Sequence, residues 1–450
     1  MRARRARQRN LFDAGYADHE VGRALAAVSG LLDGHPEFLD WVAADVARKG
    51  ASSRGRAGLS CEVILRCGIL KQLWQSDYRR LEFWLADSDS ARSFARVDPL
   101  RPPKRSALQQ CIGRVRAETW ERINRVLLAS ARDDGIETGA KVRIDSTVTE
   151  THILNPSDSQ LLYDAVRVLS RLLARGREKL GSEAFPFHDH RRAAKRRKWK
   201  IPKARTKRRV ELYRELLAVV RRTLRYADAA LVAVEGRDEP WIEDWRAQVA
   251  RYRVLAGAVV RQTVRRVLKG ETVPAEEKVV SLFEPHTDVI HKGGRQVQYG
   301  HKVNLGSGAS GLVFDAVVES GNPADSARCL PMIERHAEIY GSMPEQVALD
   351  GGYASKANLA SAKALGIGDV VFHKGKGIKS GDMASSPHVY RRLRNFRAGM
   401  EAVISYLKRC FGLDRCNWRG LAHFRSYVWS AIVSHNLWVI ARCKLKLKPI

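Results

Sequence analysis

Apolar residues recur at a helical spacing through most of the first 130 residues. In the segment 61–74, for example, Leu65, Ile69 and Trp74 recur at roughly the spacing of one helix face. Proline residues between positions 99 and 103 interrupt this pattern. The expected helices cover residues 21–28, 38–42, 61–74, 77–84 and 106–126. We therefore expect an all-helical first domain, and the sequence leaves open whether its last helix reads DNA or only packs.

A different pattern, short runs of β-forming residues separated by turns and helices, follows this helical part. It begins at residues 141–150 and resumes near residue 279, with a tight turn expected at 292–295. The expected strands are residues 141–150, 279–283, 296–305, 311–318, 346–349 and 369–373, and the expected helices are residues 326–340, 355–365 and 391–409. This order predicts an α/β fold, a mixed sheet with helical crossovers.

The segment between the first strand and the rest of the sheet is again helical and is strongly basic. Helical periodicity covers residues 161–172, 210–234 and 241–268. Between Arg191 and Arg209, twelve of nineteen residues are Lys or Arg, and Trp199 lies among them. Such a run can follow a phosphate backbone, although a solvated charged linker is the alternative. We interpret this segment as an all-helical insertion.

Charge changes the picture further, because the basic excess is spread along the chain. The 450 residues include 79 Lys and Arg against 49 Asp and Glu, a formal net charge of +30. A polyanion is the expected partner, with nucleic acid the default and an anionic membrane surface the minor alternative. No apolar run approaches the ~20 residues of a membrane span. We expect a cytoplasmic, nucleoid-associated protein with a basic arm at residues 1–10 and no membrane partner.

Three acidic residues are the candidates for chemistry. Asp145 lies in the middle of an otherwise mostly apolar strand, and Asp350 ends another strand, directly before two glycines. Glu401 shares one stripe of a helix with Arg397 and Lys408, at spacings of four and seven residues. Structural alternatives exist for each: a satisfied buried aspartate and a surface ion-pair ladder.

Four stretches in this order resemble the bacterial insertion-sequence transposases with a DDE catalytic core. They are Ile-Asp145-Ser-Thr, Tyr-Gly-His-Lys-Val-Asn (299–304), Leu-Asp350-Gly-Gly-Tyr and Arg397-x3-Glu401-x6-Lys408. The likeness runs from about residue 10 to residue 440. One position departs from the family pattern, which often has Tyr three residues before the Arg, where this chain has Arg394.

The resemblance implies a ribonuclease-H-like catalytic domain built from residues 136–154 and 276–442. Residues 1–135 would form a helical N-terminal domain for DNA binding or dimerisation, and residues 155–275 the basic helical insertion. The family's partners would be double-stranded DNA, both the terminal inverted repeats and the target. A homodimer would join two ends in the synaptic complex.

The resemblance also implies roles for single residues. Asp145, Asp350 and Glu401 would hold two Mg²⁺ or Mn²⁺ ions, which cut DNA and then transfer the strand. The residues expected to contact DNA are Arg397, Lys408, Lys302, Arg196, Arg197, Lys198 and Trp199. Lys302 could equally serve sheet packing.

Two further functions remain open from the sequence. One is a related metal-dependent DNA nuclease that cuts without strand transfer, and the other is a non-catalytic DNA-binding protein derived from a transposase. The helical first domain and the basic insertion favour a transposase, because end recognition and synapsis need additional DNA contacts.

Overall fold

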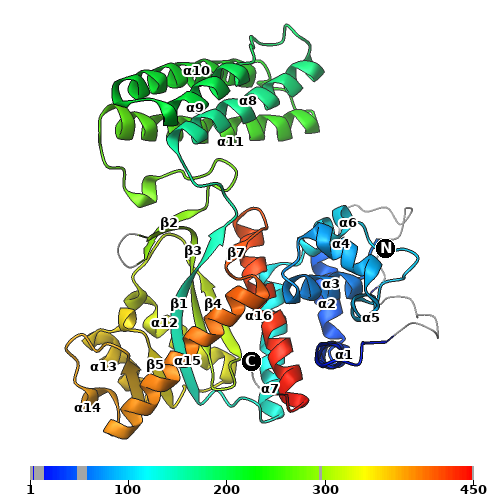
Figure 1. The fold of residues 1–450 in the computed structure, drawn as a ribbon, viewed down its shortest axis with the longest axis vertical. Helices are drawn as coiled ribbons and strands as arrows, with labels where there is room; N and C mark the ends of the chain where they lie inside the picture. Colours follow the sequence, from blue (N-terminus) through cyan, green and yellow to red (C-terminus); the bar gives the residue numbers. More distant parts are fainter. Residues whose placement is uncertain (1–3, 5–14, 48–57, 293–295, 448–450) are drawn as a thin grey trace. The chain divides into compact units, whose positions relative to one another are not determined.

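The computed structural model describes residue 4 and residues 15–47, 58–292 and 296–447. Its contacts divide the chain into two compact units (Figure 1). The first unit combines residues 1–152 with residues 301–450, and the second is the intervening segment 153–300. The expected division into three domains stays a prediction. The basic arm at residues 1–10, apart from Arg4, and the turn residues 293–295 lie outside the described part.

Seven described strands form one mixed sheet, in the order β2-β3-β1-β5-β6, with β4 beside β3 and β7 beside β1. Their bounds are β1 Lys141–Thr151, β2 Asp288–Lys292, β3 Gln296–Ser307, β4 Val313–Val318, β5 Gln346–Leu349, β6 Asp369–Phe372 and β7 Arg415–Cys416. The pairs β1–β5 and β5–β6 are parallel, whereas β2–β3 and β3–β4 are antiparallel. This mixed α/β architecture agrees with the expected fold class and is consistent with a ribonuclease-H-like domain.

Helices of the first unit cover the sheet and continue its core. They are α1 Glu20–Asp33, α2 Glu37–Val46, α3 Cys61–Leu73, α4 Tyr78–Asp87, α5 Asp89–Ala95, α6 Arg105–Ile112, α7 Ala117–Asp133, α12 Cys329–Tyr340, α13 Lys356–Ala364, α14 Ser380–Met383, α15 Pro387–Phe411 and α16 Leu421–Lys444, with 3₁₀ turns η4 Asp325–Arg328 and η5 Gly351–Tyr353. Helix α15 packs on β1, β5 and β6 (Figure 1). Helix α16 is buried on most sides, because α1, α3 and α7 all pack against it. One hydrophobic core therefore joins the N-terminal helices to the sheet.

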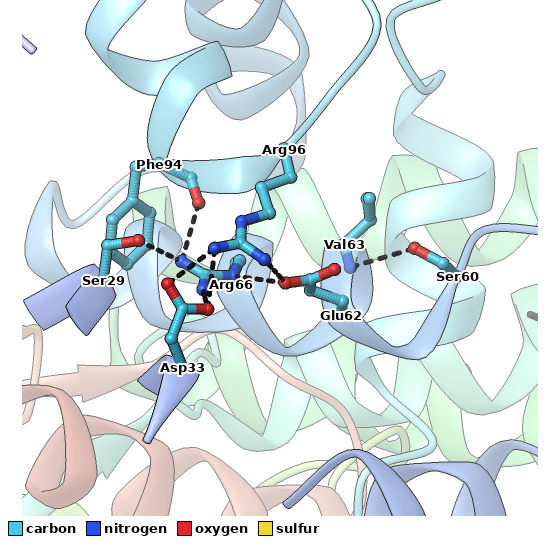
Figure 2. Close-up of polar contacts among 8 residues, drawn as sticks. All are labelled: Ser29, Asp33, Ser60, Glu62, Val63, Arg66, Phe94 and Arg96. Atoms are coloured by element: carbon cyan, nitrogen blue, oxygen red, sulfur yellow. Dashed lines mark hydrogen bonds and ion pairs between the residues drawn. The ribbon is translucent and has the colours of Figure 1, made fainter. Parts of the chain in front are cut away.

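A charged cluster fixes three of the N-terminal helices to one another (Figure 2). The guanidinium of Arg66 on α3 is buried and donates to Asp33 of α1 at 2.8 Å and to the Phe94 carbonyl of α5 at 3.2 Å. Arg96, just after α5, pairs with both Asp33 and buried Glu62. Two cations and two anions compensate one another, so this cluster is structural.

The second unit is a helical bundle with a hydrophobic core of its own. Its elements are α8 Asp158–Leu180, α9 Arg191–Lys200, η1 Ile201–Lys203, α10 Thr206–Val232, α11 Pro240–Thr263, a π turn η2 Val264–Leu268 and η3 Ala275–Glu277. Trp245 of α11 donates its indole N–H to the Leu172 carbonyl at 2.8 Å. A side chain at Gly176 would overlap this indole, since its Cβ would lie 2.3 Å from a ring carbon. The close approach of α8 and α11 thus requires glycine at this position.

Two expected elements are wrong. Residues 279–283 form no strand, because Leu282 packs into the helical core and the Ser281 hydroxyl accepts from the backbone N–H groups of Phe283 and Glu284. The single helix expected over residues 106–126 is two helices, α6 and α7. Gly113 caps α6, and Val115, which continues the apolar stripe in sequence, is buried in the turn between them.

Candidate active site

Asp145 lies on β1, where the neighbouring strand β5 ends. The parallel register pairs Ile144 with Leu349, so the next residues along the two strands are Asp145 and Asp350. Asp145 is buried, and its Oδ1 accepts from the backbone N–H of Ser146 at 2.7 Å. Its second oxygen, Oδ2, faces Arg397 of α15 at 2.7 Å. Strand pairing therefore places two of the three acids beside each other.

Asp350 lies at a turn where two following glycines make close approaches to other residues. It caps η5, and its Oδ2 accepts from the N–H of Gly352 at 3.5 Å. A Cβ on Gly351 would lie 2.9 Å from that of Lys374, and one on Gly352 would lie 2.6 Å from an Asp325 oxygen. The two glycines leave room for Lys374 and Asp325 at the end of β5, where Asp350 Oδ1 faces Arg397 at 2.9 Å.

Arg397 joins all three acids. Its Nη2 contacts Asp145 and Asp350, and its Nη1 donates to Glu401 Oε1, one turn further along α15, at 2.8 Å. The Arg397 side chain is 9% exposed, whereas that of Glu401 is 70% exposed. The Arg397–Glu401 pair is thus only the outer part of a buried cluster in which three carboxylates surround one guanidinium.

Arg143 sets the position of α15 against the sheet, and the sequence analysis missed it. Its Nη1 donates to the Phe396 carbonyl on α15 at 3.1 Å, and its Nε donates to Ser307 at 3.0 Å. A Cβ on Gly399 would lie 2.1 Å from Arg143 Nη1, so any other residue there would have to displace this guanidinium from its two partners. The sequence did offer a signal for Arg143. It lies two residues before Asp145 on the same strand, so the two side chains share one face of the sheet.

The sequence analysis also missed a hydrogen-bond network next to the turn that follows Asp350. The Tyr353 hydroxyl donates to Asn304 Oδ1 on β3 at 2.6 Å, and Asn304 Nδ2 donates to Glu319 at 2.7 Å. Burial, together with nearby Asp325 and Asp145, raises the pKa of Tyr353 well above its usual value, so the hydroxyl stays protonated and can donate. This network links the Tyr-Gly-His-Lys-Val-Asn stretch to the Asp350 turn.

Comparison with protein families finds a match for the part of the chain that contains Asp350, Arg397 and Glu401. Residues 270–437 match a family model described as transposase DDE domain. This segment is therefore similar to a transposase DDE domain. The predicted resemblance to the DDE transposases is confirmed for these residues. No curated protein and no solved structure matches the chain.

The matched segment of the DDE domain contains Asp350, Arg397 and Glu401, while Asp145 precedes it by more than a hundred residues. The pairing of β1 with β5 brings Asp145 to the other two acids, although residues 153–300 of the second unit separate them in the sequence. None of the described helices is long and apolar enough to cross a membrane.

Lys302 and Lys408, two of the lysines expected to contact DNA, have partners within the protein. Lys302 on β3 is mostly buried and donates to the Pro323 carbonyl at 2.6 Å and to Asp325 at 3.1 Å. Lys408, two turns beyond Glu401 on α15, is 21% exposed and lies 3.6 Å from Asp414. Their roles in DNA binding stay predictions.

The basic residues of α9 differ in how freely they face solvent. Arg196 is exposed, and Trp199 is 57% exposed with the Lys198 ammonium 4.1 Å from its ring centre. Arg197 is half-buried and pairs with Glu215 of α10 at 3.0 Å, a contact within the bundle. Residues 191–200 do form a helix, α9, but its contact with DNA stays a prediction.

Among the described residues, no group of three or more His, Cys, Asp and Glu side chains is arranged to hold a metal ion. Asp145, Asp350 and Glu401 instead direct oxygens to the guanidinium of Arg397. Carboxylate oxygens are nevertheless the ligands that Mg²⁺ and Mn²⁺ prefer. The three carboxylates are therefore suitable ligands for such an ion, and in this structure the guanidinium of Arg397 contacts all three.

Proposed function

We propose that this protein is a transposase that cuts DNA at the ends of an insertion sequence and joins the cut strands to target DNA. The observation that carries the proposal is the meeting of Asp145, Asp350 and Glu401 around one guanidinium. Two of these acids lie inside the segment that matches the DDE domain. DDE transposases in general depend on divalent metal ions, and the acids supply suitable ligands.

By the resemblance to the family, Asp145 is the candidate for holding both ions. Asp350 and Glu401 would each complete one ion. When bound, two divalent cations activate the attacking water or 3′-hydroxyl and stabilise the leaving oxygen. Arg397 and Lys408 would bind the scissile phosphate, the first with its planar fork and the second as a point charge. No covalent attachment to the protein is needed.

The net charge of +30 supports DNA as the partner. The exposed cations of α9 and the ring of Trp199 would extend the contact along the duplex, outside the catalytic site. In a synaptic complex, two copies of the chain would each hold one transposon end.

The decisive experiment compares cleavage and joining by the full chain on DNA that carries the element's own terminal repeats. We expect Mg²⁺-dependent cleavage in the wild type, and a loss of about a thousandfold, equivalent to about 4 kcal/mol in the barrier, in Asp145→Asn and Glu401→Gln. DNA binding should remain in both variants. Asp228→Asn, an acid that pairs with Arg253 on the surface of the bundle, is the matched control and should cleave normally.

The products separate the competing functions. Joined products containing target DNA support a transposase, whereas cleavage without joining supports a related nuclease. If the wild type binds the repeats but cuts them with neither Mg²⁺ nor Mn²⁺, the protein is a non-catalytic DNA-binding protein.

A further inference from the structure

Arg397 uses the same carboxylate oxygens that a divalent cation would need. Asp145 Oδ2 and Asp350 Oδ1 both contact its Nη2, at 2.7 and 2.9 Å. The other oxygen of each carboxylate already accepts a backbone N–H, from Ser146 and Gly352. The oxygens that face the guanidinium are thus the ones to which no backbone N–H bond is seen in these contacts, and we expect a metal ion to use them.

We propose that Arg397 is a built-in competitor of the metal ions, a counter-cation that must leave Asp145 and Asp350 before these acids can hold a divalent cation. The inference rests on the proposed function. A cation at its usual 2.0–2.1 Å from these oxygens would lie close to the position of Nη2. Guanidinium and metal therefore exclude each other, by overlap and by like charge.

The charges of the cluster favour this exchange. Three carboxylates surround a single positive charge, and the nearest further cation on β1, Arg143, is committed to Phe396 and Ser307. The cluster thus keeps excess negative charge that a divalent ion neutralises better than one guanidinium does.

Arg397 itself is incompletely satisfied in this position. Its Nε is buried and has no hydrogen-bond partner among the described residues. Its contact with Glu401 lies at the exposed side of the cluster. A buried donor without a partner weakens the bound arrangement, so the guanidinium can move away at a modest cost. Once displaced, it becomes available to a DNA phosphate, and metal loading and phosphate binding are then coupled through one side chain.

The test measures Mn²⁺ binding to the full chain without DNA, from the electron paramagnetic resonance signal of free Mn²⁺. If Arg397 occupies the acids about nine-tenths of the time, Arg397→Gln should bind Mn²⁺ on the order of tenfold more tightly. Arg394→Gln is the matched control, because it removes the same charge from an exposed position one turn earlier on α15. It should change the affinity less than twofold.

A second readout needs no activity and no metal titration. In EDTA, Arg397→Gln should melt at a lower temperature than the wild type, since three carboxylates then face one another without a cation. Adding Mn²⁺ should raise the melting temperature of Arg397→Gln by more than it raises that of the wild type. An unchanged or weaker Mn²⁺ affinity in Arg397→Gln overturns the competitor role and identifies Arg397 as a residue that organises the acids for the metal.

Asp145→Asn distinguishes this failure from failure of the proposed function. If it abolishes Mn²⁺ binding while Arg397→Gln does not tighten it, the metal site stands and only the competitor role falls. If Mn²⁺ binding is absent from the wild type, or is unaffected by Asp145→Asn, the metal site and the inference fall together.

Discussion

At Gly399, the backbone of α15 passes the guanidinium of Arg143 with no room for a side chain. The Cβ of any other residue would lie 2.1 Å from Nη1, and Arg143 is itself held by Ser307 and the Phe396 carbonyl. Arg397 and Glu401 are on the same helix, within one turn of this crossing. A single small residue therefore sets how closely α15 approaches β1.

Gly399→Ala should therefore destabilise the protein although alanine favours helices. We expect the free energy of unfolding to fall by about 1–3 kcal/mol, because either Arg143 or α15 must shift, and DNA cleavage to slow as well. Urea unfolding and cleavage rates measure the two effects. In the control Gly30→Ala, on α1, the new methyl meets nothing within 4 Å. That variant should gain about 0.5–1 kcal/mol, and an equal gain in Gly399→Ala would contradict the proposed crossing.

His435 is a buried histidine whose protonation is linked to stability. It lies on α16 between the rings of Tyr406 and Phe411 and bonds Asn436 Oδ1 at 3.0 Å. Burial lowers the pKa of His435 to about 4, from 6.5, and the bond to Asn436 offsets only part of this effect. The folded protein therefore keeps this imidazole neutral at a pH where the unfolded chain protonates it.

The predicted consequence is a loss of stability as pH falls from 6.5 to 4. In this window the unfolded state binds the proton and the folded state does not, so unfolding becomes easier by up to about 1.4 kcal/mol per pH unit, or about 3 kcal/mol in all. Chemical unfolding at several pH values measures the slope. His435→Gln should flatten it, whereas the contribution of His336, whose pKa burial also lowers, remains in both proteins. Equal slopes would exclude His435 as the source.

At the scale of elements, strand β4 depends on side chains from two helices. Among the described strands it pairs with β3 alone. Asn436 of α16 accepts from the N–H of Val313 at 2.9 Å and donates to its carbonyl at 2.7 Å, and Asn124 of α7 donates to the carbonyls of Val313 and Phe314. The two amides thus occupy backbone groups that a further strand would otherwise pair with.

Asn436→Leu should break this connection. It leaves the buried Val313 N–H without its partner and removes one of the two donors to the Val313 carbonyl, with an expected cost of roughly 1–3 kcal/mol. Thermal unfolding would record the lower stability. Ser434→Ala, which removes only a bond within α16, should cost about 1 kcal/mol or less. If the two variants are equally stable, the asparagine contacts do not support β4.

For the whole molecule, the dominant quantity is the charge of +30. Helix α9 concentrates part of it, with Arg192, Lys195, Arg196 and Lys200 all exposed. Helical geometry presents these side chains on the surface, while Ala194 packs into the bundle core. Salt-dependent DNA affinity should follow from such a surface, because bound phosphates release their counterions.

Replacing these four exposed cations with Gln should weaken DNA binding and reduce its salt dependence. The slope of the logarithm of affinity against the logarithm of salt concentration should fall by about 3 if most of them contact phosphates. A variant that exchanges Lys and Arg at the same four positions keeps the charge and should keep the slope. Fluorescence anisotropy between low and moderate salt measures both, and identical slopes in all three proteins would exclude α9 from the interface.

How far the sequence predicts this molecule can be judged from particular elements. The strand that ends at Leu349 was predictable, since an apolar run stops there at an acid followed by two glycines. The strand expected at residues 279–283 was wrong, because a short apolar run fits a strand and a buried loop equally well. The approach of Arg143 to Gly399 joins residues more than 250 positions apart, and no local pattern records it.

The amino-acid sequence by itself determined the α/β class, the basic character and the three acids as candidates, because periodicity, composition and strand-end motifs are local properties. Only the tertiary structure decided that a buried guanidinium contacts all three acids, that Arg143 positions α15, and that two asparagines bond the backbone at the edge of β4. These features depend on contacts between distant segments, and side-chain packing in three dimensions alone determines which residues meet.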